Sequence, residues 1–190
     1  MFSKILIKLI DQAIVPALML LSARIVSVVL ISRYYGINYD IAESGFVFSS
    51  ASDYVLINTY STFFMLVVLT VGLLYILLKA YIFHETHISP KVTAKLFSLR
   101  LSSFIQASFD LYSQGAIWLS YTFFLTLVSG ILGVFGLIQS WVFFAGLVLN
   151  IISTTLLVFD VVKEMEIKKS DFAEFDTDSE FLEENNEAYS

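Results

Sequence analysis

The chain has 190 residues, of which 57% are hydrophobic, and its mean hydropathy is +0.80. Soluble domains contain roughly 45–50% apolar residues, so this composition excludes an ordinary soluble protein and indicates an integral membrane protein. The absence of cysteine excludes disulfides, thiolate metal sites and thiol nucleophiles.

The first apolar run predicts a transmembrane helix over residues 13–33. The run is uncharged except for Arg24 near its middle and Arg33 at its end, and its length is just enough to cross about 30 Å of hydrocarbon. We expect a true span in which Arg24 is buried or snorkels toward the interface. Two alternatives are a tilted interfacial helix and a signal peptide cleaved after Ala23.

Residues 34–59 contain no Lys or Arg and are expected to form a connector outside the membrane. Asp53 follows a stretch rich in Ser and Ala, and we expect it to cap the next helix. The run that follows is free of charge until Lys79 and predicts a second span over residues 59–83.

The connection after the second span is basic. Beyond Pro90 its apolar residues recur at helical spacing, which predicts an amphipathic helix over residues 90–112 lying on the bilayer surface. A cytoplasmic extension of the third span, packed on its own bundle, is an equally open alternative. His84 and His87 are interpreted as a polar cap of the second span. A zinc site needs further ligands, so we expect no metal and no other cofactor.

Two further runs, residues 116–138 and 141–162, predict an antiparallel pair of spans joined by a short polar turn. Small side chains along the third span are expected to let a neighbouring helix approach closely. These residues are Ser129, Gly130, Gly133 and Gly136.

Two polar residues inside the spans form the candidate site. At 1.5 Å per residue, counting from the outer ends of the spans puts Arg24 and Asn150 at one depth. We therefore expect the first and fourth spans to touch, with Arg24 hydrogen-bonded to Asn150. One interpretation of this pair is structural, and the other is that it handles a substrate or an ion.

Three carboxylates, Asp11, Asp110 and Asp160, lie near the cytoplasmic ends of the spans. They either pair with lysines among the lipid headgroups or form a proton or cation site. Residues 163–190 hold ten acidic residues and three lysines, with phenylalanines interspersed. This pattern is typical of a disordered acidic tail.

Basic residues alternate with the spans, which predicts cytoplasmic termini. The fold class is therefore an all-α integral membrane protein. Residues 1–162 form its four-helix domain, in a plasma membrane of bacterial type. Because no catalytic motif is present, we expect no enzyme and no nucleic-acid partner. The first functional hypothesis is a non-catalytic subunit or scaffold that binds lipid and either other membrane proteins or its own copies. The second is a small transporter or channel component using Arg24 and Asn150.

Overall fold

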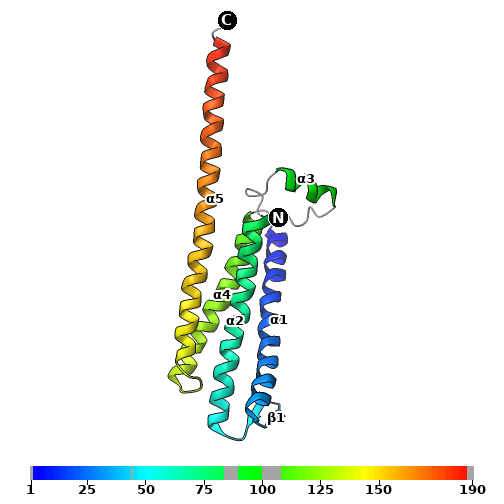
Figure 1. Cartoon of the computed structure of the whole chain (residues 1–190), viewed down its shortest axis with the longest axis vertical. Coiled ribbons are helices and arrows are strands. Elements are labelled where there is room, and N and C mark those ends of the chain that lie inside the picture. The colour runs from blue at the N-terminus through cyan, green and yellow to red at the C-terminus, as the bar shows by residue number, and fades with distance from the viewer. Residues whose placement is uncertain (1, 44, 84–89, 100–107, 188–190) are drawn as a thin grey trace.

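The structure is a computed structural model that describes residues 2–43, 45–83, 90–99 and 108–187. Four long helices form a bundle: α1 (Phe2–Tyr35), α2 (Ala51–Phe83), α4 (Ser108–Val134) and α5 (Trp141–Glu187) (Figure 1). Four segments within them are long and apolar enough to cross a membrane, and this confirms the prediction of a mostly helical protein with four such helices. These segments are Ile7–Tyr35, Ala51–Lys79, Asp110–Val134 and Trp141–Lys163.

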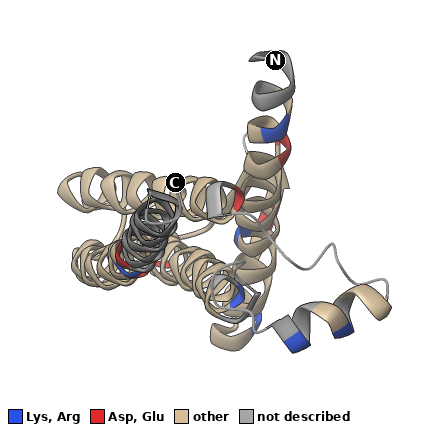
Figure 2. Ribbon diagram, turned by 90° about the horizontal axis from the view of Figure 1, so that it is seen from above, with Lys and Arg blue, Asp and Glu red and all other residues tan. Residues whose placement is uncertain are grey.

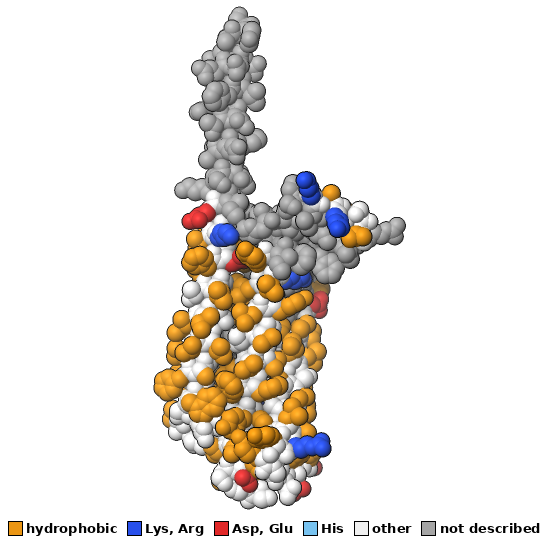
Figure 3. Space-filling view, in the orientation of Figure 1, with side chains coloured by type: hydrophobic (Ala, Val, Ile, Leu, Met, Phe, Trp, Pro, Cys, Tyr) orange, Lys and Arg blue, Asp and Glu red, His pale blue; other side chains and the backbone are white. Residues whose placement is uncertain are grey.

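The surface of the bundle is apolar between two charged ends. Figure 3 shows hydrophobic side chains over the face in view, with charged side chains gathered above and below them. Leu18, Phe123 and Phe144 are each more than half exposed. An apolar surface of this extent would be unfavourable in water and suits contact with lipid.

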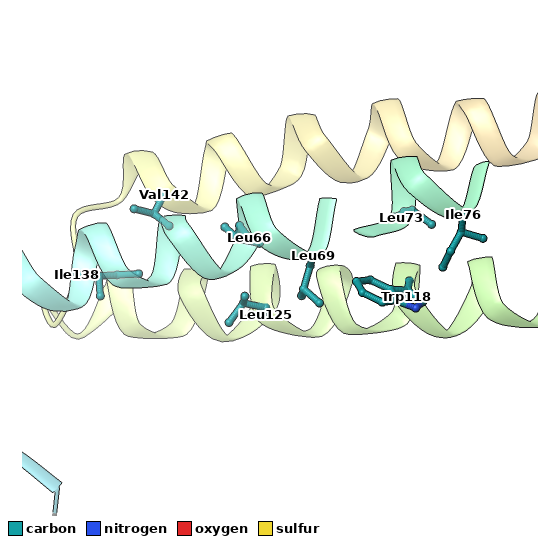
Figure 4. Close-up of a cluster of buried hydrophobic side chains, with 8 residues drawn as sticks. All are labelled: Leu66, Leu69, Leu73, Ile76, Trp118, Leu125, Ile138 and Val142. Carbon is teal, nitrogen blue, oxygen red and sulfur yellow. The ribbon is translucent and has the colours of Figure 1, made fainter. Parts of the chain in front are cut away.

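Helix α2 forms the centre of the bundle. It packs against α1, α4 and α5, and α4 also packs against α1 and α5. Leu66, Leu69 and Leu73 of α2 are fully buried, and Trp118 and Leu125 of α4 lie beside them (Figure 4). This shared core fixes the register between α2 and α4.

The connection between α1 and α2 folds into a β-hairpin that the sequence did not predict. Strands β1 (Tyr39–Ala42) and β2 (Gly45–Phe48) pair antiparallel. Helix α2 begins at Ala51, well before the predicted residue 59. Ser50 caps it, because its Oγ accepts the backbone N–H of Ser52 at 3.2 Å. Asp53 lies in the first turn instead, so the expectation that it caps the helix is wrong.

Glycines follow the C-terminal ends of two helices of the bundle, α1 and α4. Gly36 and Gly136 both have φ of +69°, a conformation that glycine adopts without a steric penalty. After α4, Leu137 N donates to Leu132 O at 2.9 Å and Gly136 N to Gly133 O at 3.1 Å. These two bonds form a Schellman motif, so α4 stops at Val134 although residues 116–138 were predicted as one span.

The predicted amphipathic helix over residues 90–112 is not one element. Helix α3 covers Pro90–Ser98, and the residues from Ser108 onward belong to α4. Residues 100–107 lie outside the described part of the chain. Seen from the end of the bundle, α3 lies beside the four long helices (Figure 2). The structure therefore combines a separate short helix with an extension of the third span.

The expectation of a disordered tail over residues 163–190 is corrected by α5. Its backbone stays helical through Glu187 and projects beyond the bundle (Figure 1). Low apolar content argued for disorder, but local propensity favours a helix, because residues 163–190 contain neither Gly nor Pro. The acidic composition of this segment does not prevent its helical backbone.

Candidate functional site

Arg24 is held by helix α2. Its guanidinium donates one hydrogen bond to Ser61 Oγ and another to Asn58 Oδ1. Asn58 and Ser61 lie three residues apart on α2, so they share one face of the helix, and both are buried. Ala23 and Ser27 are buried beside Arg24 on α1. The arginine therefore faces a neighbouring helix and not lipid.

The side chain of Arg24 extends along α2 toward the β-hairpin. Ala23 and Val26, which lie on either side of Arg24 in the sequence, line a shallow groove with Phe64 and Val68 of α2, so the Arg24 backbone lies level with this part of α2. Its two acceptors lie about one to two turns nearer the hairpin. This direction moves the positive charge away from the middle of the span, where it would cost most.

The acceptors of Arg24 lie at the level where the chain turns from α4 into α5. Thr59, next to Asn58, accepts at its Oγ1 the backbone N–H of Gln139 at 3.0 Å. Gln139 belongs to the turn between α4 and α5, so α4 ends and α5 begins at this level. Helices α1 and α2, with the β-hairpin that joins them, extend farther in this direction than the turn between α4 and α5 (Figure 1). Counting depth from residue 33, the predicted outer end of the first span, therefore placed Arg24 too deep.

Asn150 forms a separate polar site between α5 and α4. Its amide nitrogen donates to Thr126 Oγ1 at 2.7 Å, to Gly146 O at 2.9 Å and to Thr122 O at 3.3 Å. Its Oδ1 lies 3.1 Å from Thr122 Oγ1. Asn150 is buried, and its hydrogen-bonding groups are used within these two helices.

The predicted pairing of Arg24 with Asn150 is wrong. The hydrogen bonds of Arg24 go to α2, whereas those of Asn150 go to α4 and to its own helix. Sequence reasoning missed the real partners because Asn58 fell in the predicted connector and Thr122 and Thr126 carried no charge. A usable signal was the polar spacing of Asn58 and Ser61, one turn apart.

The opposite end of the bundle carries an ion pair. Lys8 Nζ lies 2.5 Å from Asp110 Oδ1, and both side chains are partly exposed. This pair joins the first turns of the span in α1 to the start of α4. Asp11 and Asp160 form no hydrogen bond or ion pair with the described residues. The structure thus gives Asp110 a lysine partner and does not gather the three carboxylates through direct bonds.

The small residues of α4 lie at its contact with α5. A Cβ added at Gly130 would be 2.9 Å from Phe143 Cδ2, so this position needs glycine or a shift of the ring. At Gly133 the nearest atom, Ser140 Cα, would be 3.7 Å away, an ordinary contact. Ser129 is buried and donates to Thr126 O at 2.7 Å. Gly136 belongs to the turn and not to this helix face.

Two other glycines, which sequence reasoning did not select, make closer approaches. A Cβ at Gly72 would lie 1.9 Å from Trp118 Cζ3, and one at Gly146 would lie 2.6 Å from Thr126 Oγ1. Both are isolated in their helices, so no small-residue spacing marked them. Their role follows from the large side chain on the facing helix.

Among the described residues, no group of three or more His, Cys, Asp or Glu side chains is placed to hold a metal ion. His84 and His87 lie outside the described part of the chain. No family model, curated protein or solved structure matches this sequence. The polar contacts and the exposed helices are therefore the basis for proposing a function.

Proposed function

We propose that this chain is a non-catalytic subunit or scaffold of a bacterial-type plasma membrane. Its four-helix bundle anchors it in lipid. The short helix α3 and the projecting part of α5 bind other proteins on the cytoplasmic side. Both segments lie at the end of the bundle where α1 begins (Figure 1).

The continuous helix α5 carries this proposal. It runs without a break from Trp141 to Glu187, whereas its apolar segment ends at Lys163. Residues 164–187 extend the helix by about 36 Å at 1.5 Å per residue. The segment is strongly acidic, so it suits a partner with a basic surface.

Helix α3 supplies a surface of the opposite charge. Lys91 and Lys95 are one turn apart and both exposed. Phe97 and Leu99 are also exposed, so basic and apolar side chains occur together. Such a combination suits the headgroup region of a membrane and an acidic partner docked beside it.

Charge distribution supports the proposed orientation. The end with α3 contains Lys8, Lys91 and Lys95, whereas the hairpin end contains Arg33 together with Asp40 and Glu43. Cytoplasmic segments near membrane spans are enriched in Lys and Arg. We infer that both termini are cytoplasmic.

A small transporter or channel component is the second candidate. It is suggested by the presence of Arg24 and Asn150 within apolar helices. Because both side chains are hydrogen-bonded to neighbouring helices, they are accounted for by packing. We therefore place the scaffold first.

Co-purification in mild detergent tests the proposal. The full chain is compared with a deletion of residues 170–190, with the double variant K91E/K95E, and with Thr155→Val as a lipid-exposed control. We expect a stoichiometric partner that binds the full chain and the control but is lost from one of the other two. An identical set of bound proteins in all four would contradict the scaffold. Ion or solute flux in proteoliposomes that is abolished by Arg24→Leu would favour the second candidate.

A further inference from the structure

A groove of about 500 Å³ lies between α1, α2 and α4. It is separate from the contacts of Arg24 and Asn150. Most of its surface is apolar, with polar groups at one end. Its lining includes Gln12, Val15, Met19, Tyr75, Gln114 and Trp118. The groove opens on a surface that faces lipid.

Unpartnered hydrogen-bond donors gather at the polar end of the groove. Gln12 accepts the hydroxyl of Ser113 at 3.0 Å through its Oε1, which leaves its amide N–H groups unused among the described residues. The side-chain amide of Gln114 likewise has no partner in the described part of the chain. These amides lie one helical turn from the Lys8–Asp110 ion pair, just inside the charged end of the bundle.

Trp118 supplies a further donor. Its side chain lines the groove and is 7% exposed, and its indole N–H has no hydrogen-bond partner among the described residues. The six-membered ring lies against Gly72, so the nitrogen is on the other edge of the indole. Figure 4 shows the Trp118 ring between α4 and α2, next to Ile76. An N–H without an acceptor in hydrocarbon costs free energy, so this site favours a ligand that brings an acceptor.

Charged residues of both signs lie within about one helical turn of the groove lining: Lys8 and Asp11 on α1, Lys79 on α2 and Asp110 on α4. Lys8 and Asp110 pair with each other, and the described residues give Lys79 no ion pair. A zwitterionic headgroup, which carries a phosphate and an ammonium, finds a partner of each sign here.

We propose that this groove binds one acyl chain of a zwitterionic diacyl phospholipid. The chain lies along Val15, Met19 and Val71, and the ester carbonyl oxygens accept hydrogen bonds from Trp118 and Gln114. Ester carbonyls lie just inside the headgroups, at the depth of these donors. The bound lipid seals the contact between α1, α2 and α4.

Fluorescence quenching by brominated lipid tests the assignment, because Trp118 and Trp141 are the only tryptophans. Trp141→Phe leaves Trp118 as the reporter. Trp118→Phe leaves Trp141, which is 39% exposed at the other end of the bundle and reports bulk lipid. Each variant is reconstituted in vesicles of ether-linked phosphatidylcholine with increasing ester-linked phosphatidylcholine brominated on its acyl chains. We expect Trp118 to reach half of its maximal quenching at a roughly threefold lower mole fraction than Trp141. Equal mole fractions, or weaker quenching of Trp118, would overturn the proposal.

Matched variants in the Trp141→Phe background locate the lipid. Val15→Phe fills the groove, whereas Ile14→Phe adds the same ring on the neighbouring exposed position of α1. We expect only Val15→Phe to bring the quenching of Trp118 to the bulk value; an equal effect of both would contradict a bound lipid. Unbrominated ester-linked phosphatidylcholine should displace the brominated lipid better than its ether-linked analogue. Equal displacement would remove the hydrogen bonds from the assignment.

Discussion

Asn150 Nδ2 donates to Thr126 Oγ1 at 2.7 Å, which joins α5 to α4 inside the bundle. Gly146 makes this contact possible, because a Cβ at that position would lie 2.6 Å from the same hydroxyl. Gly146 also accepts from the Asn150 amide through its carbonyl oxygen at 2.9 Å. The spacing of four residues between glycine and asparagine therefore provides both the space and the hydrogen bond.

The first prediction is that Asn150→Leu lowers the free energy of unfolding by about 0.6–2 kcal/mol, the range measured for polar contacts between membrane helices. The loss is limited because Thr126 Oγ1 still donates to Thr122 O at 2.8 Å. Steric-trapping measurements in bicelles would give this free energy.

Thr155→Val is the matched control for Asn150→Leu. Thr155 is exposed on the same helix and donates only to Ile151 O of its own helix, at 2.8 Å. We expect its free energy of unfolding to stay within about 0.5 kcal/mol of the unmodified chain. An equal loss in the two variants would show that the contact between α4 and α5 does not depend on the asparagine.

The second prediction concerns Arg24 and its acceptor Asn58. Asn58→Leu removes an acceptor from a partly buried charge and should lower the free energy of unfolding by about 1–3 kcal/mol or more. Arg24→Leu removes the charge itself and should cost less. The double variant R24L/N58L should be more stable than Asn58→Leu alone, because no guanidinium that has lost one of its two acceptors remains.

Double-mutant cycles measured by the same method separate the two possible partners of Arg24. Arg24 and Asn58 should show a clear coupling energy. Arg24 and Asn150 should be additive within about 0.5 kcal/mol, because they share no hydrogen bond. Coupling of Arg24 to Asn150 and not to Asn58 would contradict the observed arrangement.

The four spans were predictable because their signal is local. Each is a long apolar run, and helix length relates directly to the thickness of hydrocarbon. The partner of Arg24 was not predictable in this way. Its identity depends on the fact that the α1–α2 hairpin projects beyond the turn at Gln139, and no residue count within one span contains that offset. The hydrogen bond from Gln139 N to Thr59 Oγ1 records it in the structure.

The remaining differences also have physical causes. The hairpin of Tyr39–Ala42 with Gly45–Phe48 is short, and strands of four residues carry little periodicity. The groove at Trp118 involves three helices that are distant in sequence. The acidic composition of residues 163–190 predicted a disordered tail. The helical backbone to Glu187 instead follows from residue propensities along the segment.

The third prediction tests the helical tail. Deleting residues 170–190 should leave the mean residue ellipticity at 222 nm nearly unchanged, because helical residues are removed in about the proportion in which the whole chain contains them. If this segment were disordered, its removal would raise the helical signal per residue. Thermal unfolding of the bundle should also be unchanged, since the segment projects beyond the other helices (Figure 1).

The fourth prediction compares two neighbouring glycines. Gly136→Ala forces a side chain into the left-handed region and should lower the free energy of unfolding by about 1–2 kcal/mol. Gly133→Ala lies within α4, where its Cβ would meet Ser140 at ordinary distance, so it should be neutral or stabilising. Thermal unfolding of both variants in the same detergent measures the difference. An equal loss in the two variants would mean that the positive φ of Gly136 does not account for the effect of its replacement.

The last prediction concerns the two ends of the bundle. The β-hairpin and helix α3 lie at opposite ends (Figure 1), and the proposed orientation puts α3 in the cytoplasm. Because the chain has no cysteine, Ala42→Cys and Ser98→Cys each introduce a single thiol at an exposed position. A membrane-impermeant maleimide added to intact cells should label the variant at Ala42. The variant at Ser98 should react only after the membrane is permeabilised, and the unmodified chain controls for background.

Labelling of both variants in intact cells would contradict the four-span arrangement. Labelling of Ser98→Cys alone would keep the four spans and reverse the orientation, which would place the docking helices outside the cell and contradict the proposed scaffold.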